Sequence, residues 1–138
     1  MIITIPGTPP LWRRARLTRG GSHYTDAATR ADEARVANAA RGIRMPDGPI
    51  RLHIVAIWPR PKSRPALVPV EVWRLGCAFR KPTTPDWDNV GKAVSDGLTK
   101  AGTWADDARV AVASVETWYA GVNNGACTVV TVEPVGWT

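Results

Sequence analysis

Residues 84–110 contain five aspartates, four of which have spacings that could bring their carboxylates together. Asp86 and Asp88 are two residues apart, so an extended backbone would point both carboxylates to one side. Asp106 and Asp107 follow directly before a segment rich in valine. If the residues between form a helix that turns back as a strand, Asp107 would come to lie beside Asp86 and Asp88. The spacing therefore predicts a cluster of carboxylates.

Such a cluster is costly without a cation, because nearby like charges raise one another's pKa. Mg²⁺ is a suitable ion, since it accepts oxygen ligands from one or two carboxylates and keeps several waters. A bound ion of this kind can activate an attacking water and neutralise charge on a phosphate. Lys92 lies four residues after Asp88, on the same face of the expected helix, and could hold that phosphate. The residues thus suggest metal-assisted hydrolysis of a phosphate ester by water.

The same residues also have a purely structural interpretation. Aspartate is a common helix N-cap, and a DxD pair in a proline-rich loop needs no metal. Asp96 follows Lys92 by four residues, which favours a surface ion pair between the two side chains. The pattern by itself leaves the metal site and the helix caps open as alternatives.

Charge is distributed unevenly along the 138 residues, whose formal net charge is +6. Residues 1–81 carry 15 basic and 5 acidic side chains, whereas residues 82–138 carry 3 and 7. A basic half suits a polyanionic partner, because binding releases counterions from its phosphates. The cations that we expect to contact backbone phosphate are Arg13, Arg14, Arg16, Arg19, Arg60, Lys62, Arg80 and Lys81. The alternative is that these side chains belong to solvated basic loops.

Segments rich in β-branched residues predict strands over residues 1–5, 51–58, 110–119 and 127–132. The last two are joined by Gly-Val-Asn-Asn-Gly, which suggests an antiparallel hairpin. An alanine-rich stretch predicts a helix over 26–42, capped by Thr25 or Asp26 and ending at Gly42. A second helix is expected over 89–100, with Asp88 as its cap and Gly102 after its end.

Two basic stretches are expected to lie outside these elements. Residues 8–24 are rich in arginine, proline and glycine, which predicts an exposed loop. Residues 59–85 contain six prolines and several cations, and we expect this stretch to be both mobile and functional. Trp12 and Trp73 lie in these stretches and could stack on an exposed base. Trp87 is expected to anchor its loop, and Trp104 to pack beneath the later aspartates.

The cysteines and the apolar stretches of the sequence indicate which metal sites and which cellular compartment to expect. Cys77 and Cys127 have no CxxC spacing, so we expect no zinc site and two reduced side chains in or near the core. The amino-terminal residues lack the pattern of a signal peptide, and no stretch approaches the ~20 apolar residues of a membrane helix. We expect one soluble cytoplasmic domain over residues 1–138.

The segment PDWDNVGKAVSDGLTKAGTWADDARV resembles the central motif of the RusA family of Holliday-junction resolvases. That motif has a DxDN, a lysine four residues on, a DxL and a DD pair at this spacing. The opening of the chain is also similar, with a first strand, PGTPP, an arginine-rich stretch and a Tyr24-Thr25 entry to a helix. The likeness covers most of the chain, but only residues 84–110 are specific.

The resemblance implies a homodimer of α+β subunits, each with a small mixed sheet and two main helices. It also implies dependence on Mg²⁺, which Mn²⁺ could replace, and paired symmetric nicks across a four-way DNA junction in a bacterial or phage-infected cell. By position, the metal-binding or catalytic carboxylates are Asp86, Asp88 and Asp107, Lys92 is the essential cation, and Asp106 is an accessory ligand.

Two departures from the family pattern bear on how DNA is held. Family members often carry a lysine after the DD pair, where this chain has Glu116-Thr117, and residues 59–83 form a long proline-rich stretch. Two other functions remain to be separated by experiment. One is a nuclease with a broader preference for branched or flap DNA, and the other is a DNA-binding module without catalysis.

Overall fold

The computed structural model describes residues 1–14, 16–21, 23–24 and 26–138. The strands are β1 (Ile2–Pro6), β2 (Arg16–Leu17), β3 (His23–Tyr24), β4 (Ile50–Trp58), β5 (Phe79–Arg80), β6 (Val110–Tyr119) and β7 (Cys127–Pro134). The helical elements are α1 (Ala27–Ala39), α2 (Val70–Arg74), α3 (Trp87–Ala101) and the 3-10 turn η1 (Asp107–Arg109).

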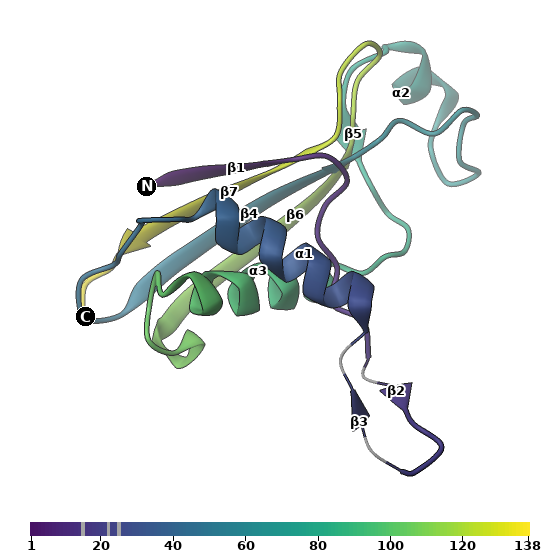
Figure 1. The fold of residues 1–138 in the computed structure, drawn as a ribbon. Coiled ribbons are helices and arrows are strands. Elements are labelled where there is room, and N and C mark those ends of the chain that lie inside the picture. The colour runs from purple at the N-terminus through teal and green to yellow at the C-terminus, as the bar shows by residue number, and fades with distance from the viewer. Residues whose placement is uncertain (15, 22, 25) are drawn as a thin grey trace.

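Five strands form one mixed sheet in the order β1-β7-β4-β6-β5. β4 pairs in parallel with β6 and antiparallel with β7, and β1 pairs antiparallel with β7. The two long helices, α1 and α3, lie together on one face of this sheet (Figure 1). The predicted α+β architecture with a mixed sheet and two main helices is confirmed.

The predicted hairpin between β6 and β7 is wrong, because β4 lies between them. Residues 120–126 instead pass around the end of β4, where the Ala120 amide donates to the Trp58 carbonyl at 2.8 Å. The alternate residues of β4 from Ile50 to Trp58 are all buried, so one face of this strand packs on the core. Both of its edges are paired, one with β6 and the other with β7.

The core fills the space between the sheet and the two helices. The inward residues of β4 meet an apolar stripe on α3 made of Val90, Ala93, Val94 and Leu98, all of which are fully buried. The helical spacing of that stripe is the one the sequence predicts. Burial of this stripe fixes the rotation of α3, and therefore the direction in which its polar face presents Asp88 and Lys92.

Helices α1 and α3 approach each other closely at Gly97. A Cβ atom added there would lie 2.5 Å from the Val36 Cβ and 3.0 Å from the Glu33 carbonyl oxygen. Glu33 is itself buried, and its carboxylate is paired with Lys100 of α3. The small residue at position 97 therefore allows the two helices to pack backbone to backbone.

The helix ends agree only partly with the predictions. Asp26 caps α1 by accepting the Ala28 amide at 2.8 Å, as predicted, whereas Thr25 lies outside the described residues. α1 ends at Ala39, before Gly42. α3 begins at Trp87 with Asp86 as its N-cap residue, so the prediction of Asp88 as the cap is wrong; Gly102 ends the helix as predicted, with a φ of 71°.

Both basic stretches contain short secondary structure. β2 and β3 form a small hairpin that extends away from the body, and α2 and β5 lie near the opposite end of the molecule (Figure 1). Residues 8–24 are therefore not a plain loop. The mobility expected of residues 59–85 stays a prediction.

The two cysteines are free, but Cys77 is exposed, so its predicted place in or near the core is wrong. Among the described residues, no helix has the length and apolar character needed to cross a membrane.

Candidate functional site

The amino-terminal half of α3 and the turn η1 form one wall each of a cavity of about 320 Å³. Asp88 and Lys92 reach it from α3, and Asp107 reaches it from the start of η1. Strands β4 and β6 close the cavity on the sheet side with apolar residues, including Leu52 and Val115. Two carboxylates and an ammonium that lie up to 19 residues apart in sequence thus share one partly apolar site.

Asp86 lies in a neighbouring cavity of about 350 Å³, which is lined by the loop 81–87 and Thr117. It is the N-cap residue of α3, yet its side chain makes no capping hydrogen bond. Trp87 lines both this cavity and the one that holds Asp88. The carboxylate of Asp86 is therefore not used to cap the helix, which removes the main structural explanation for that residue.

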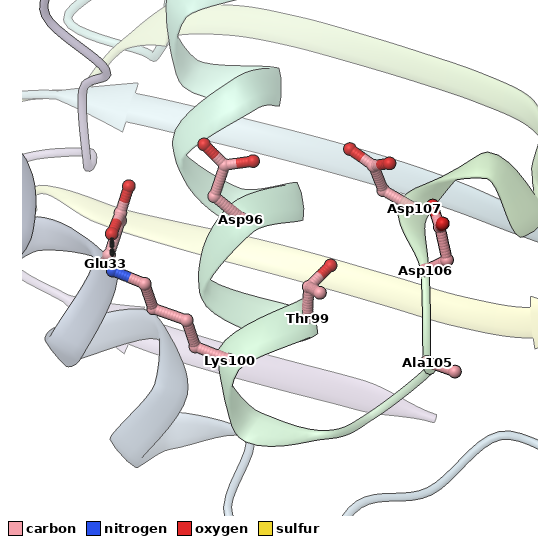
Figure 2. Close-up of a pocket in the computed structure, with 7 residues that line it drawn as sticks. All are labelled: Glu33, Asp96, Thr99, Lys100, Ala105, Asp106 and Asp107. Atoms are coloured by element: carbon pink, nitrogen blue, oxygen red, sulfur yellow. Dashed lines mark hydrogen bonds and ion pairs between the residues drawn. The ribbon is translucent and has the colours of Figure 1, made fainter. Parts of the chain in front are cut away.

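Asp106 has a different environment from Asp107. Its side chain accepts the Ala108 amide at 2.8 Å and so caps η1. Figure 2 shows it together with Asp107 at one side of a third cavity, with the paired Glu33 and Lys100 at the other side and Asp96 of α3 between them. The structural use of aspartate that the sequence left open applies to Asp106, whereas Asp107 borders both this cavity and the one containing Asp88.

The arrangement can be compared with what a magnesium ion requires. Within the part of the chain that is described, no three His, Cys, Asp or Glu side chains are grouped closely enough to hold an ion together. Mg²⁺ needs only one or two carboxylates and completes its shell with water. Asp88 and Asp107, which line the same cavity, match that number. The carboxylates of Asp86 and Asp107 have no hydrogen-bond or ion-pair partner among the described residues. Exposed carboxylates that make no hydrogen bond or ion pair are available to a hard divalent cation.

Lys92 makes the ion pair with Asp96 that the sequence predicts, at 3.3 Å. Both side chains are partly exposed, so the pair contributes little to stability and its ammonium can exchange partners at low cost. The Lys92 Nζ also lies 5.5 Å from the centre of the Trp12 ring. Lys92 is thus held over the cavity between Asp88 and Trp12 without being buried.

The predicted phosphate contacts divide into exposed and occupied side chains. Arg14, Arg19 and Lys62 are exposed and have no partner among the described residues. For Arg16 only the backbone, in β2, is described. Arg13 pairs with Asp32 at 3.2 Å, and Arg60 lies 4.0 Å from the centre of the Trp73 ring while donating to the Trp73 carbonyl.

Arg80 and Lys81 both have partners within the chain. Arg80 pairs with Glu116 at 3.8 Å and stacks on Trp118. Val115 faces α3, so Glu116, the next residue of β6, faces the opposite side of the sheet. Arg80, which pairs with Glu116, is thus engaged on the face of the sheet opposite α3, and its contact with backbone phosphate stays a prediction.

Lys81 is buried, with only 6% of its surface exposed, so the expectation of an exposed phosphate contact is wrong. Its ammonium donates to the carbonyl oxygens of Thr83 at 2.6 Å and Pro85 at 3.1 Å, and lies 4.5 Å from the centre of the Trp58 ring. These bonds tie down the loop that ends at Asp86. Burial lowers the pKa of Lys81 below its ordinary value of 10.5, and the charge of Asp86 partly opposes this.

Replacing Lys81 with methionine should change how stability depends on pH. Because the folded pKa is lowered, the unfolded chain binds more protons than the folded one at pH values just below 10.5. The free energy of unfolding of the wild type, relative to Lys81→Met, should therefore rise as the pH increases towards 10.5. Urea unfolding of both proteins between pH 7 and pH 10.5 measures this difference. A difference that stays constant or falls with pH would contradict the buried, desolvated position of the ammonium.

Two tryptophans near the site differ in burial. Trp87 is 63% exposed, so the prediction that it anchors its loop is wrong. Trp104 is buried in the core and donates from Nε1 to the Thr99 hydroxyl at 2.8 Å, as expected for a residue packed beneath the DD pair. Asn89, to which the sequence assigned no role, has an amide side chain without a partner among the described residues. Its place in the DxDN motif is the signal that could have drawn attention to it.

Comparison with known proteins agrees with this site. The family model for endodeoxyribonuclease RusA matches residues 6–133. The chain belongs to the RusA family of endodeoxyribonucleases. It is 32% identical over 108 residues to the crossover junction endodeoxyribonuclease RusA of Enterobacteria phage 82, an alignment that covers 78% of this chain and 74% of the phage protein. The family match spans the described carboxylates of the site, Asp86, Asp88 and Asp107.

Proposed function

We propose that this protein is a divalent-cation-dependent endonuclease that resolves four-way DNA junctions. The observation that carries the proposal is the shared cavity of Asp88, Lys92 and Asp107, within a chain of the RusA family. The name of the phage relative supplies the substrate class, a crossover junction. Junction resolution also agrees with the excess of basic residues in the first 81 positions.

Asp88 and Asp107 would hold the cation, with Asp86 beside them. Mg²⁺, or Mn²⁺ in its place, supplies a Lewis acid that favours attack by water and neutralises charge on the phosphate. Lys92 contacts the scissile phosphate as a point charge, exchanging its bond to Asp96 for one to a phosphate oxygen. The amino-terminal end of α3 adds a partial positive charge beside the same phosphate. The apolar residues of β4 and β6 limit the water around it, which strengthens each of these interactions.

The substrate requires two cuts, and we propose that a homodimer makes them. A two-fold symmetric dimer presents two identical active sites to two strands of like polarity. Each protomer would consist of one domain, in agreement with a family match over residues 6–133. The proposal includes that the protein acts in the cytoplasm of a bacterial or phage-infected cell, where a DNA substrate would be found.

The direct test is cleavage of a synthetic four-way junction in the presence of Mg²⁺ or Mn²⁺. We expect paired nicks at symmetric positions in opposite strands, and no nicks when the ion is removed with EDTA. A fork, a flap and a linear duplex of the same sequence serve as controls, and comparable cutting of all four would indicate a broader nuclease. Absence of cleavage with both ions would contradict the proposal. Calorimetric titration with Mg²⁺ then shows whether the ion site is present. A protein with the site should release or absorb heat on binding Mg²⁺, and this heat should be lost when the carboxylates are replaced. A DNA-binding module without catalysis should give no such heat.

A further inference from the structure

A cavity of about 390 Å³ borders the amino-terminal end of α3, which also borders the cavity of Asp88 and Asp107. It joins the start of the arginine-rich stretch to the DxDN motif. Its lining residues are Leu11, Trp12, Arg13, Arg14, Pro85 and Asn89. It contains cationic, aromatic and amide groups and no acidic side chain, which suits an anionic ligand with a planar part.

This cavity is directly connected with the candidate catalytic residues. The Trp12 amide donates to the Asn89 carbonyl at 3.0 Å, which fixes the arginine-rich segment against α3. Pro85 and Asn89 are the residues on either side of the segment that carries Asp86 and Asp88. The ring of Trp12 also lies 5.5 Å from the Lys92 Nζ. A strand whose phosphate met Lys92 would have its next nucleotide within reach of the cavity.

The segment that carries Trp12 is held in place by buried groups of α1. Asp32 accepts the Leu11 amide at 3.0 Å and pairs with Arg13 at 3.2 Å. The Arg13 amide donates to the hydroxyl of buried Thr29 at 3.0 Å. With Arg13 occupied in this way, the guanidinium of Arg14 is left exposed at the cavity. The cavity is therefore built in advance rather than formed by a loose loop.

Trp73 provides a useful contrast, because the sequence gives the two tryptophans the same role. The guanidinium of Arg60 lies 4.0 Å from the centre of the Trp73 ring. The ring of Phe79 packs edge-on against the Trp73 ring, with 6.1 Å between the ring centres. Trp73 is thus engaged in the packing of residues 60–79. Trp12 instead lines an open cavity beside the catalytic helix.

We propose that this cavity binds one nucleotide of the cleaved strand, next to the scissile phosphate. The base stacks on Trp12, the phosphate is bound by Arg14, and the Asn89 amide hydrogen-bonds to the edge of the base. The inference rests on the proposed function, since the ligand is a nucleotide of the substrate junction. It assigns to Trp12 and Asn89 a part in the choice of cleavage position. An amide can discriminate between bases because it both donates and accepts a hydrogen bond.

The test uses a fluorescently labelled four-way junction with a mobile centre, so that many sequences pass through the crossover point. Binding is measured by anisotropy in EDTA, which excludes cleavage, and cleavage positions are mapped separately with Mg²⁺. The variants are Trp12→Ala, Trp12→Phe and Asn89→Ala. Trp137→Ala is the matched control, because Trp137 is 85% exposed and lines a different cavity. Thermal unfolding confirms that each variant is folded.

Trp12→Ala should weaken junction binding roughly tenfold, and Trp12→Phe should restore most of it, as expected for loss of one stacked base. Asn89→Ala should spread cleavage over more sequences, lowering the preference for the favoured position by roughly tenfold. Trp137→Ala should match the wild type in both measurements. If the wild type cleaves the junction but the three variants bind and cut as it does, the subsite is wrong and the proposed function stands. If the wild type does not cleave but Trp12→Ala still weakens binding, the proposed function fails, and the cavity is a DNA-binding site without the proposed part in cleavage.

Discussion

Asp88→Asn is expected to lower the rate of junction cleavage by roughly three orders of magnitude while leaving junction binding nearly unchanged. The substitution keeps the size of the side chain and the hydrogen bond that it accepts from the backbone N–H of Asn89. It removes the negative charge that would hold the cation. Removing a single electrostatic group from an active site typically lowers the rate by roughly 10²–10³-fold. Loss of the bound ion would lower the rate further. The measurement is single-turnover cleavage with Mg²⁺, accompanied by anisotropy binding in EDTA.

Asp106→Asn is the matched control for this prediction. Asp106 lies next to Asp107, but its carboxylate caps η1 through the Ala108 amide. An asparagine oxygen can accept the same hydrogen bond, so we expect the rate to stay within roughly tenfold of the wild type. If Asp88→Asn and Asp106→Asn lowered the cleavage rate equally, the assignment of Asp88 to catalysis and of Asp106 to helix capping would be incorrect.

Gly97→Ala should give the largest loss of stability of any single methyl addition to α3. The new Cβ would lie 2.5 Å from the Val36 Cβ and 3.0 Å from the Glu33 carbonyl oxygen, and neither atom is the free end of a flexible side chain. α1 must move away from α3, which disturbs the buried pair of Glu33 and Lys100 as well. Overpacking of a core costs about 1–3 kcal/mol, and we expect the free energy of unfolding to fall by about 3 kcal/mol because backbone atoms are involved.

Gly91→Ala on the same helix separates this clash from the general effect of alanine on a helix. A Cβ at position 91 would meet only the Val115 Cγ2, at 3.4 Å. Alanine is favoured over glycine in a helix interior by about 1 kcal/mol, so this variant should be as stable as the wild type or more stable. Urea unfolding of both variants provides the comparison. A similar loss in both would indicate that helix packing at Gly97 is not the cause.

The local pattern of the sequence was sufficient for the elements that carry the site. The apolar stripe from Val90 to Leu98 predicted both the existence of α3 and the face that it buries, because an amphipathic helix has only one stable orientation on a sheet. The spacing of Asp88 and Lys92 then placed both side chains on the opposite, accessible face. Such features depend on residues within about two turns of one another, and they can be read directly from the chain.

The order of the strands in the sheet could not be predicted from local sequence patterns in the same way. A glycine- and asparagine-rich turn between β6 and β7 suggested a hairpin, but in the sheet β4 lies between these two strands and pairs with both. The gain from burying β4 on both edges involves strands more than 50 residues away in sequence, and no local pattern records it. For the same reason the helix contact at Gly97 became visible only with α1 in place.

The basic residues show most clearly what the tertiary structure decides. In the sequence Arg14, Arg60 and Lys81 are equivalent cations in proline-rich surroundings. In the folded chain Arg14 is exposed, Arg60 is stacked on Trp73, and Lys81 is buried against loop carbonyls. Charge and spacing predicted that carboxylates and a lysine come together, and in the structure Asp88, Lys92 and Asp107 line one cavity. Which cations remain available to a phosphate depends on partners far away in sequence, because a charged group is free only where the fold leaves it unpaired and in contact with water.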